Sequence, residues 1–595
     1  MKKHYLASLI LPAILLSSCT LLASTKTYEK EIAVYDLDKI DENGKIESGL
    51  QTTLNTRYIG GREYLPYITF EQYVSLYEPH LAEDAVSEIK KSRYGISWTI
   101  TIGESLYFAT EIDYYSRQII IAGDLEATYA DDDDPRDLKA LDYAMGSKAE
   151  GKFLSDRNYG LYSYRDAKIS SFTYGGDTYF PLSFLDITYS YNSAIYFTYN
   201  YAHIFSTRDV DNYNTFLYED DGVQWTFESQ MSGNKKHEFI PSYLVEYNAN
   251  LFVYLMDNFY GLKDYYNITS MASFYKNTGI YHNLFSSLDG NRGQAYLDAL
   301  TILDDNHTTL YSVAPVWNET DLSGRRYGKG ITARSQLRSQ LREMRRDVYG
   351  RYQENGAKKI VHPEEDILYS SDGKSAMFAF DSFVFGTSED VFNPDGTIKE
   401  TAKSSDTFIK ILHILTTIKN KGGVENVILD ISINGGGVVG VMMKLLALLS
   451  KDNKGHLTFY DDKTTQASIY TCFVDSNQDG EYDAKDCFGN DFNFYILTSD
   501  CSFSCGNAFP ALAQIVGDAK IIGQKSGGGE CAVAIHYLPN SQYVYHSSNL
   551  HLGFYDEAKD EFIGFEKGVT PDITLDINED FYSIDALNNA IKNAN

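Results

Sequence analysis

Hydrophobic and polar residues alternate along much of the first third of the chain. The segments ISWTITIGESLYF (residues 96–108) and RQIIIAGDLEATY (residues 117–129) mix Ile, Thr and Tyr with polar residues in near alternation. A period of two is typical of strands that bury one face. We therefore predict β-rich tandem modules over residues 30–210.

Two short segments of this β-rich region are similar to each other. YIGGREYLPYITF (residues 58–70) and YGGDTYFPLSF (residues 174–184) carry a Gly-Gly pair, a tyrosine and a proline at the same offsets. The pattern resembles the small β-modules named for the amine oxidase N-terminal domain. The acidic run Asp131 to Asp134, followed by Pro135, predicts a solvated linker between the copies rather than a metal site.

The hydrophobic period becomes helical after about residue 240. PSYLVEYNANLFVYLMDNFYGL has Pro241 at its start and Gly261 near its end, which is the expected asymmetry of a helix. RSQLRSQLREMRRDVYG (residues 334–350) predicts a basic amphipathic helix, which we expect to be a solvated face rather than a binding helix. These patterns indicate a helical part over residues 215–360.

Strand and helix patterns alternate after about residue 360. NVILDI (residues 426–431) and NFYILT (residues 493–498) are short apolar runs typical of buried strands, and each is followed by a helical pattern. Alternation of this kind predicts an α/β core over residues 361–595. The chain as a whole is expected to be a multidomain α+β protein.

Composition narrows the class of protein. The chain has 595 residues, which is too long for one ordinary domain, and 43% of them are hydrophobic, enough for several cores. The formal net charge of −30 argues against nucleic acid as a partner and against electrostatic adhesion to anionic lipid.

The first residues have the pattern of an export signal. Lys2 and Lys3 precede an apolar run from Leu6 to Leu16 that is short for a membrane span. Leu16-Ser17-Ser18-Cys19 resembles the bacterial lipobox, which implies a lipoprotein signal peptide over residues 1–19 and lipidation of Cys19. An ordinary signal peptide is the alternative. We expect an exported lipoprotein, anchored to the membrane on its extracytoplasmic face through the lipid only.

The segment DSNQDGEYDAKD (residues 475–486) has the spacing of a calcium-binding loop. Oxygen-bearing side chains fall at positions 1, 3, 5, 9 and 12, with glycine at position 6, and the loop closes with aspartate as dockerin-type loops do. A plain acidic turn is the alternative. No catalytic cofactor is expected. The predicted ligands of a structural Ca²⁺ are Asp475, Asn477, Asp479, Glu481, Asp483 and Asp486.

Five cysteines lie in the last quarter of the chain. Export would place them where disulfides can form, and their odd number leaves the pairing open. Two of them bracket the acidic loop, as an insertion at residues 472–487, and could clamp it. The five are Cys472, Cys487, Cys501, Cys505 and Cys531.

The stretch YILTSDCSFSCGNAFPALAQ (residues 495–514) crowds small polar residues between a strand pattern and a helix pattern. Ser504 would be either a nucleophile or an ordinary helix N-cap. In the preceding strand–loop–helix unit, the amides of Gly435 to Gly437 could hold an oxyanion. His307, in LDDNHTTL, is a candidate base in a polar loop, where a histidine is otherwise simply solvated.

Four motifs in the second half of the chain, in order, resemble those of the tail-specific, or carboxy-terminal-processing, serine peptidases, in particular the tricorn-like branch. LDDNHTTL resembles the D-x-H-T segment of that branch, and VILDISINGGG resembles D-L-R-x-N-x-G-G. SFSCGNAF resembles S-A-S-A-S-E, and EKGVTPDITL (residues 566–575) resembles G-K-G-V-x-P-D-I.

This resemblance implies a fold and a catalytic apparatus. The fold would be the ClpP/crotonase-like β/α spiral, with the histidine loop carried by the preceding helical part. Ser504 would be the nucleophile, and Cys505 as nucleophile is a second possibility. The implied roles are Ser504, His307 and Glu566 as a catalytic triad, and the amides of Gly436, Gly437 and Cys505 as the oxyanion hole.

The sequence also departs from the family pattern. The lysine base of the carboxy-terminal-processing branch would fall on Gly529, and Lys525 is out of register. Phe565 stands where the acid is expected, with Glu566 one residue closer to the glycine. There is no room for a peptide-binding PDZ module between Thr309 and Ile360.

These observations predict a serine endopeptidase that hydrolyses peptide or protein substrates. One alternative is a catalytically inactive homologue that binds peptides or partners as a surface lipoprotein. Another is a wall or glycan adhesion protein whose β-modules carry the function.

Overall fold

The computed structural model describes residues 26–36, 49–78, 81–103, 105–123, 147–154, 159–189, 193–198, 201–206, 217–220, 223–226, 239–312, 329–349, 363–386, 391, 393, 398–540 and 542–594. The predicted signal peptide with Cys19 and the acidic run at Asp131–Asp134 lie outside these residues. No helix among the described residues is both long and apolar enough to cross a membrane.

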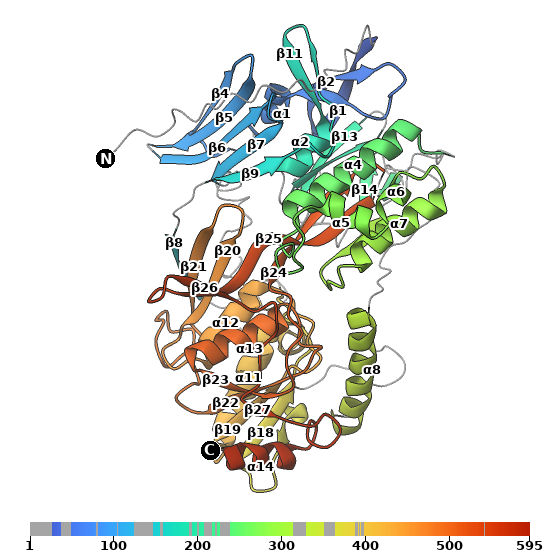
Figure 1. Ribbon diagram of the computed structural model, residues 1–595. Helices are drawn as coiled ribbons and strands as arrows, with labels where there is room; N and C mark the ends of the chain where they lie inside the picture. The colour runs from blue at the N-terminus through green and yellow to red at the C-terminus, as the bar shows by residue number, and fades with distance from the viewer. Residues whose placement is uncertain are drawn as a thin grey trace.

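Two antiparallel-rich sheets form the N-terminal part (Figure 1). In the second sheet, Ile96, Trp98 and Ile100 of β5 (Gly95–Ile102) are buried, as the alternating pattern predicts. The first sheet contains, in order, β10 (Phe172–Tyr174), β11 (Asp177–Pro181), β3 (Tyr67–Thr69), β2 (Gly49–Ile59), β1 (Thr27–Asp36), β13 (Tyr201–Ser206) and β12 (Ser193–Thr198). The second contains β4 (Ala85–Lys91), β5 (Gly95–Ile102), β6 (Ser105–Asp113), β7 (Gln118–Gly123) and β9 (Gly160–Ser163).

The two similar sequence segments lie side by side. Strands β3 and β11 pair antiparallel, with Pro181 opposite Tyr67, and the Leu182 N–H donates to the Pro66 carbonyl at 3.0 Å. Each strand leads directly into a short helix, α1 (Phe70–Tyr77) or α2 (Leu182–Tyr189). The internal repeat in the sequence is therefore also a repeat in structure.

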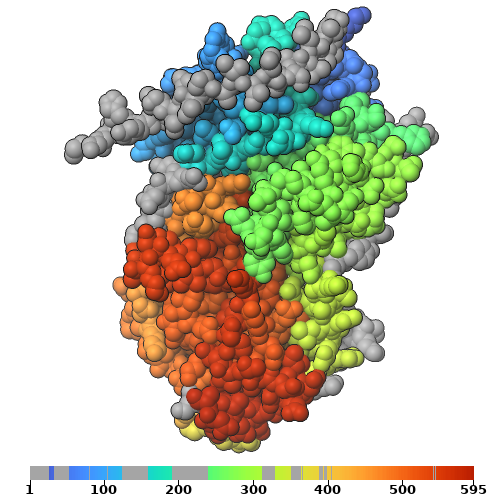
Figure 2. All heavy atoms as spheres, viewed as in Figure 1, coloured from blue at the N-terminus to red at the C-terminus, as the bar shows by residue number. Residues whose placement is uncertain are grey.

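A helical layer follows. Helix α4 starts directly after Pro241 and ends before Gly261, as predicted. It lies between the N-terminal sheets and the C-terminal part, and Figure 2 shows this green layer between them. The helices are α4 (Ser242–Phe259), α5 (Met271–Asn277), α6 (Tyr281–Leu284) and α7 (Asp289–Thr301).

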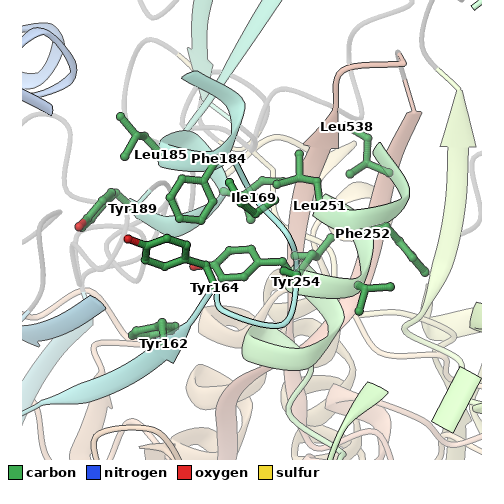
Figure 3. Packing of buried hydrophobic residues seen from close by; sticks show 14 of the residues in the cluster. Tyr162, Tyr164, Ile169, Phe184, Leu185, Tyr189, Leu251, Phe252, Tyr254 and Leu538 are labelled. Atoms are coloured by element: carbon green, nitrogen blue, oxygen red, sulfur yellow. The ribbon is translucent and has the colours of Figure 1, made fainter. Parts of the chain in front are cut away.

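One continuous aromatic core joins these parts (Figure 3). The rings of Tyr164 and Phe184 lie 5.2 Å apart, and those of Phe184 and Tyr254 lie 5.1 Å apart. Leu538, from strand β24 (Cys531–Leu538) of the C-terminal part, belongs to the same cluster. Many of the buried residues of this cluster are tyrosines, which accounts for part of the high tyrosine content.

The C-terminal part contains a six-stranded sheet in which all strands except the edge strand β17 run parallel. Helices and sheets occur together in several regions, so the predicted multidomain α+β fold is confirmed. The sheet order is β17 (Leu368–Tyr369), β18 (Ser375–Ala379), β19 (Asn426–Asp430), β22 (Asn493–Thr498), β23 (Ala519–Gly523) and β27 (Ile573–Thr574). Its helices include α11 (Thr407–Lys421), α12 (Val439–Leu449), α13 (Cys505–Val516) and α14 (Ile584–Ala594).

A second C-terminal sheet includes a strand from the N-terminal third of the chain. Strand β8 (Ser147–Leu154) pairs antiparallel with β21 (Gln466–Val474), from Leu154 opposite Ala467 to Ser147 opposite Val474. Residues 30–210 therefore do not form modules separate from the C-terminal part. The sheet contains β16 (Thr309–Ser312), β25 (Gln542–Asp556), β20 (Gly455–Asp461), β21 (Gln466–Val474) and β8 (Ser147–Leu154), with β24 (Cys531–Leu538) and β26 (Glu561–Gly564) paired to β25.

Helix α8 (Lys329–Tyr349) forms as expected, but it is not a solvated basic face along its whole length. Arg345 is only 2% exposed, and its guanidinium lies 2.7 Å from the carboxylate of the fully buried Asp430. A buried carboxylate needs a partner of opposite charge, which explains why this arginine points inward.

Candidate active site

Ser504 occupies a strained turn at the start of helix α13. Its φ of 57° and ψ of −126° are a conformation that residues with a side chain rarely adopt. Although it precedes the helix, its side chain makes no capping hydrogen bond. The chain around it is held by the Ser504 N–H, which donates to the Gly528 carbonyl at 3.0 Å. The ordinary N-cap interpretation therefore does not explain this serine.

The glycine loop (residues 434–437) lies against Ser504. A Cβ added to Gly436 would lie 2.7 Å from Ser504 Cβ, 3.0 Å from Ser504 Oγ and 3.1 Å from the Cys505 nitrogen. Only glycine allows this approach. The two loops are also joined by the Phe503 N–H, which donates to the Asn434 carbonyl at 3.0 Å.

The predicted oxyanion donors differ in their bonding. Cys505 is the first residue of α13, so its N–H has no acceptor within the helix, and it lies beside Gly436. The Gly436 N–H instead donates to Asn434 Oδ1 at 2.8 Å, so this amide can serve an oxyanion only if that bond opens. Gly437, the next residue, pairs with Phe383 through a parallel bridge.

The thiol of Cys505 does not have the properties of a nucleophile. Its side chain is buried and donates to the Gly437 carbonyl at 3.1 Å. Burial raises the pKa of the Cys505 thiol to about 12, so almost no thiolate exists at neutral pH. Its burial and its hydrogen bond to Gly437 therefore argue against Cys505 as the nucleophile.

His307 comes from a distant part of the chain, between α7 and β16, and its ring lies against the residue that precedes Ser504. The ring centres of His307 and Phe503 are 4.7 Å apart. The His307 N–H donates to Asp305 Oδ1 at 2.9 Å, which fixes the loop, and Nδ1 lies 3.5 Å from Ser547 Oγ. The histidine and serine motifs thus meet in space.

Glu566 follows strand β26 and touches the loop that holds Ser504. Its Oε2 accepts from the N–H groups of Gly529 at 3.1 Å and Glu530 at 2.9 Å. Burial, with the charges of Asp305 and Glu530, raises the pKa of Glu566 to about 7, although the two amide bonds oppose this shift.

The departures from the family pattern have structural explanations. Phe565 is buried in the hydrophobic core, whereas the carboxylate of Glu566 binds the N–H groups of Gly529 and Glu530. Gly529 has φ +85°, and a Cβ there would lie 2.5 Å from the Phe503 ring, so a lysine does not fit in this slot.

Three residues next to the site were not found from the sequence. Ser547 contacts His307, Glu530 contacts Glu566, and His551 contacts Glu530. All three are ordinary polar residues on or beside strands β24 and β25. Their role depends on strand pairing between distant segments, which leaves no local pattern.

The acidic loop at 475–486 turns at Gly480, whose φ is +82°, and its carboxylates accept hydrogen bonds from its own amides. The described residues contain no group of three or more His, Cys, Asp or Glu side chains gathered to hold a metal. All five cysteines of the last quarter are buried free thiols, so Cys472 and Cys487 are not joined.

A strained serine beside a glycine loop, with an imidazole close by, is the arrangement of a serine-type hydrolase. Residues 396–575, less than a third of the chain, match the family model described as peptidase family S41. The family predicted from the four motifs is therefore confirmed.

Several solved proteases match parts of the chain at low identity and low TM-score. The photosystem II D1 C-terminal processing protease is 15% identical over 36% of this chain and 49% of its own, with a TM-score of 0.26. Mature CPAF is 10% identical over 59% of this chain and 96% of its own, with a TM-score of 0.35. The tricorn protease is 10% identical over 95% of this chain and 59% of its own, with a TM-score of 0.32. This chain spans about half of the D1 processing protease. No curated protein sequence matches it.

Proposed function

We propose that this protein is an exported, lipid-anchored serine endopeptidase that uses Ser504, His307 and Glu566. The observation that carries the proposal is the backbone of Ser504, which is strained at a helix start although its hydroxyl caps nothing. Strain of this kind persists where the side chain has a function that the conformation serves.

The chemistry follows from the positions of these groups. His307 takes the hydroxyl proton as Ser504 Oγ attacks the carbonyl carbon of the scissile peptide bond. The negative charge that forms on the carbonyl oxygen is stabilised by the Cys505 N–H and by an amide of the glycine loop. His307 then gives the proton to the leaving amine, and water hydrolyses the acyl-enzyme by the same steps.

Glu566 and Ser547 support the imidazole in this proposal. The Ser547 hydroxyl faces His307 Nδ1, so Nε2 is the nitrogen that would take the proton from Ser504. Ionised Glu566 would offset the positive charge of the imidazolium during the reaction.

A fluorophosphonate probe tests the proposal because it reacts only with an activated serine. We expect the wild-type protein to be labelled and Ser504→Ala to be unlabelled. Cys505→Ala is the matched control, since it keeps the backbone N–H and removes only the thiol, and it should still be labelled. Equal labelling of Ser504→Ala would remove the serine mechanism.

One observation favours the second candidate, an inactive homologue that binds peptides at the same site. The Gly436 N–H is engaged by Asn434, so the oxyanion hole is not fully open. In that case no variant would be labelled, whereas a peptide library would still bind to the wild-type protein.

The anchor and the metal are further parts of the proposal. Lipidation at Cys19 is supported by the lipobox resemblance, and Cys19→Ala should move the protein from the membrane to the soluble fraction. Calcium at residues 475–486 is supported by the order of oxygen side chains and the glycine turn. Calcium titration of the wild-type protein and of Asp475→Asn, followed by thermal unfolding, should show stabilisation only in the former.

A further inference from the structure

A buried ion pair lies behind Glu566. Glu530 precedes strand β24, His551 lies on strand β25, and Glu530 Oε1 is 2.9 Å from His551 Nδ1. Their side chains are only 10% and 12% exposed. Burial opposes protonation of His551, but its contacts with Asp462, Cys531 and Glu530 outweigh burial and raise the pKa, which favours the charged imidazole.

Glu530 and Glu566 hold each other through reciprocal hydrogen bonds. Glu530 Oε2 accepts from the Glu566 N–H at 2.7 Å and also from the Phe565 N–H. In return, Glu566 Oε2 accepts from the Glu530 N–H at 2.9 Å. The fit is close, since a Cβ added to Gly564 would lie 2.4 Å from Glu530 Oε2.

We propose that the Glu530–His551 ion pair is a positioning device that fixes Glu566 and sets the pH above which the peptidase works. The inference rests on the proposed role of Glu566. The second carboxylate makes ionisation of Glu566 harder, and the imidazolium partly compensates that carboxylate.

Other charged or titratable groups face these residues. Asp305 acts on Glu566 from the histidine loop, and the charge of Glu566 acts on Tyr265 and Tyr266 of the loop after α4 and on Cys531. Asp462 lies 3.7 Å from His551 Nε2, on the other side from Glu530. None of these groups is changed in Glu530→Gln or His551→Gln. A difference in the pH profile between these two variants therefore reports on the ion pair.

The two members of the pair should move the acidic limb of the pH profile in opposite directions. Glu530→Gln keeps an acceptor for the amides but removes the negative charge, so the acidic limb of kcat/KM should move down by about one pH unit. His551→Gln removes the cation and leaves Glu530 uncompensated, so the limb should move up. Equal losses of activity with no movement of the limb would overturn the proposal and indicate a purely structural pair.

A second Glu–His pair in the same chain is the matched control. Glu364, in the short helix Pro363–Asp366, has its Oε2 3.0 Å from Nε2 of His413 in α11. Glu364→Gln and His413→Gln should leave the limb unmoved.

A measurement without turnover separates this inference from the proposed function. Thermal unfolding of Ser504→Ala protein is followed from pH 4 to 8, with and without Glu530→Gln. Because the pKa of Glu566 is raised from 4.5 to about 7, its ionisation lowers stability across that interval. Glu530→Gln should make this decrease in stability smaller, but only in protein that still has Glu566. The same reduction in a Glu566→Gln background would overturn the inference even if fluorophosphonate labelling succeeds.

Discussion

Two neighbouring loops of the C-terminal part reach positive φ angles with different residues. The glycine loop follows β19 and the serine loop (residues 499–504) follows β22, and these strands pair in parallel, so both loops lie at one edge of the sheet. The glycine loop reaches positive φ angles with Gly436 and Gly437, whereas the serine loop does so with Ser504. Where no side chain is needed, glycine removes the strain. The serine retains it, which indicates that its hydroxyl is needed.

The largest effect should come from removing that hydroxyl. Ser504→Ala should lower kcat/KM by about 10⁴-fold or more, because the nucleophile is lost, while the backbone turn stays the same. Activity on a fluorogenic peptide and the midpoint of thermal unfolding would be measured together. A large fall in the unfolding midpoint would show that the hydroxyl is structural instead.

The next largest effect should come from the glycine that touches the serine. Gly436→Ala places a methyl group against Ser504 Oγ and the Cys505 amide, so kcat should fall about 10²-fold, with little change in KM. The unfolding midpoint should also fall, because the alanine would have to adopt φ +107°. Unchanged kcat would separate this loop from the oxyanion site.

The pH dependence of stability extends the comparison to Glu566, which accepts hydrogen bonds from Gly529 and Glu530, next to the Gly528 carbonyl that binds the Ser504 N–H. The pKa of Glu566 is raised to about 7 in the folded protein, so the folded state holds its proton more tightly than the unfolded state. Stability should therefore decrease as pH rises from 4.5 to 7, by up to about 3 kcal/mol from this group. Glu566→Gln should remove that decrease, measured by urea unfolding at both pH values.

A smaller effect should show the strain directly. Residues with a Cβ rarely adopt the positive φ of Ser504, so Ser504→Gly should stabilise the fold by about 1 kcal/mol. The same variant should have no activity, because the hydroxyl is lost. Urea unfolding of the wild-type, alanine and glycine variants gives the difference. Equal stability of the alanine and glycine variants would mean that the turn stores no strain.

The smallest effect is expected at the other end of the glycine loop. A Cβ on Gly435 would meet nothing closer than the Arg338 guanidinium at 3.4 Å, which is the flexible end of a side chain. Gly435→Ala should change stability by less than about 0.5 kcal/mol and leave kcat within a factor of two or three. It is the matched control for Gly436→Ala.

The sequence predicted those parts of the site that have local patterns. Ser504, the glycines and His307 could be found because each lies in a short motif whose residue types the chemistry requires. Glu566, the proposed acid, stands one residue out of the family register, and Phe565, in the expected position, is buried in the hydrophobic core.

The parts that could not be predicted depend on pairing between distant segments. Ser547 and His551 are placed by strand β25, and Arg345 is buried because Asp430 lies beneath α8. A helix pattern gives the direction of each side chain, but not which neighbour has a buried charge. Only tertiary structure supplies that information.

Strand β8 has a consequence for how the chain matures. During synthesis, which starts at the amino end, Leu154 is made long before its pairing partner Ala467. The β-rich N-terminal part can bury its own aromatic residues early. Strand β8 can pair with β21 only after residues 466–474 have been made. Long-range pairing of this kind slows folding. A fragment starting near residue 361 would lack β8 and leave β21 as an open sheet edge, inviting association with other chains. A fragment cut near residue 361 should therefore be an aggregation-prone incomplete sheet rather than a minimal enzyme.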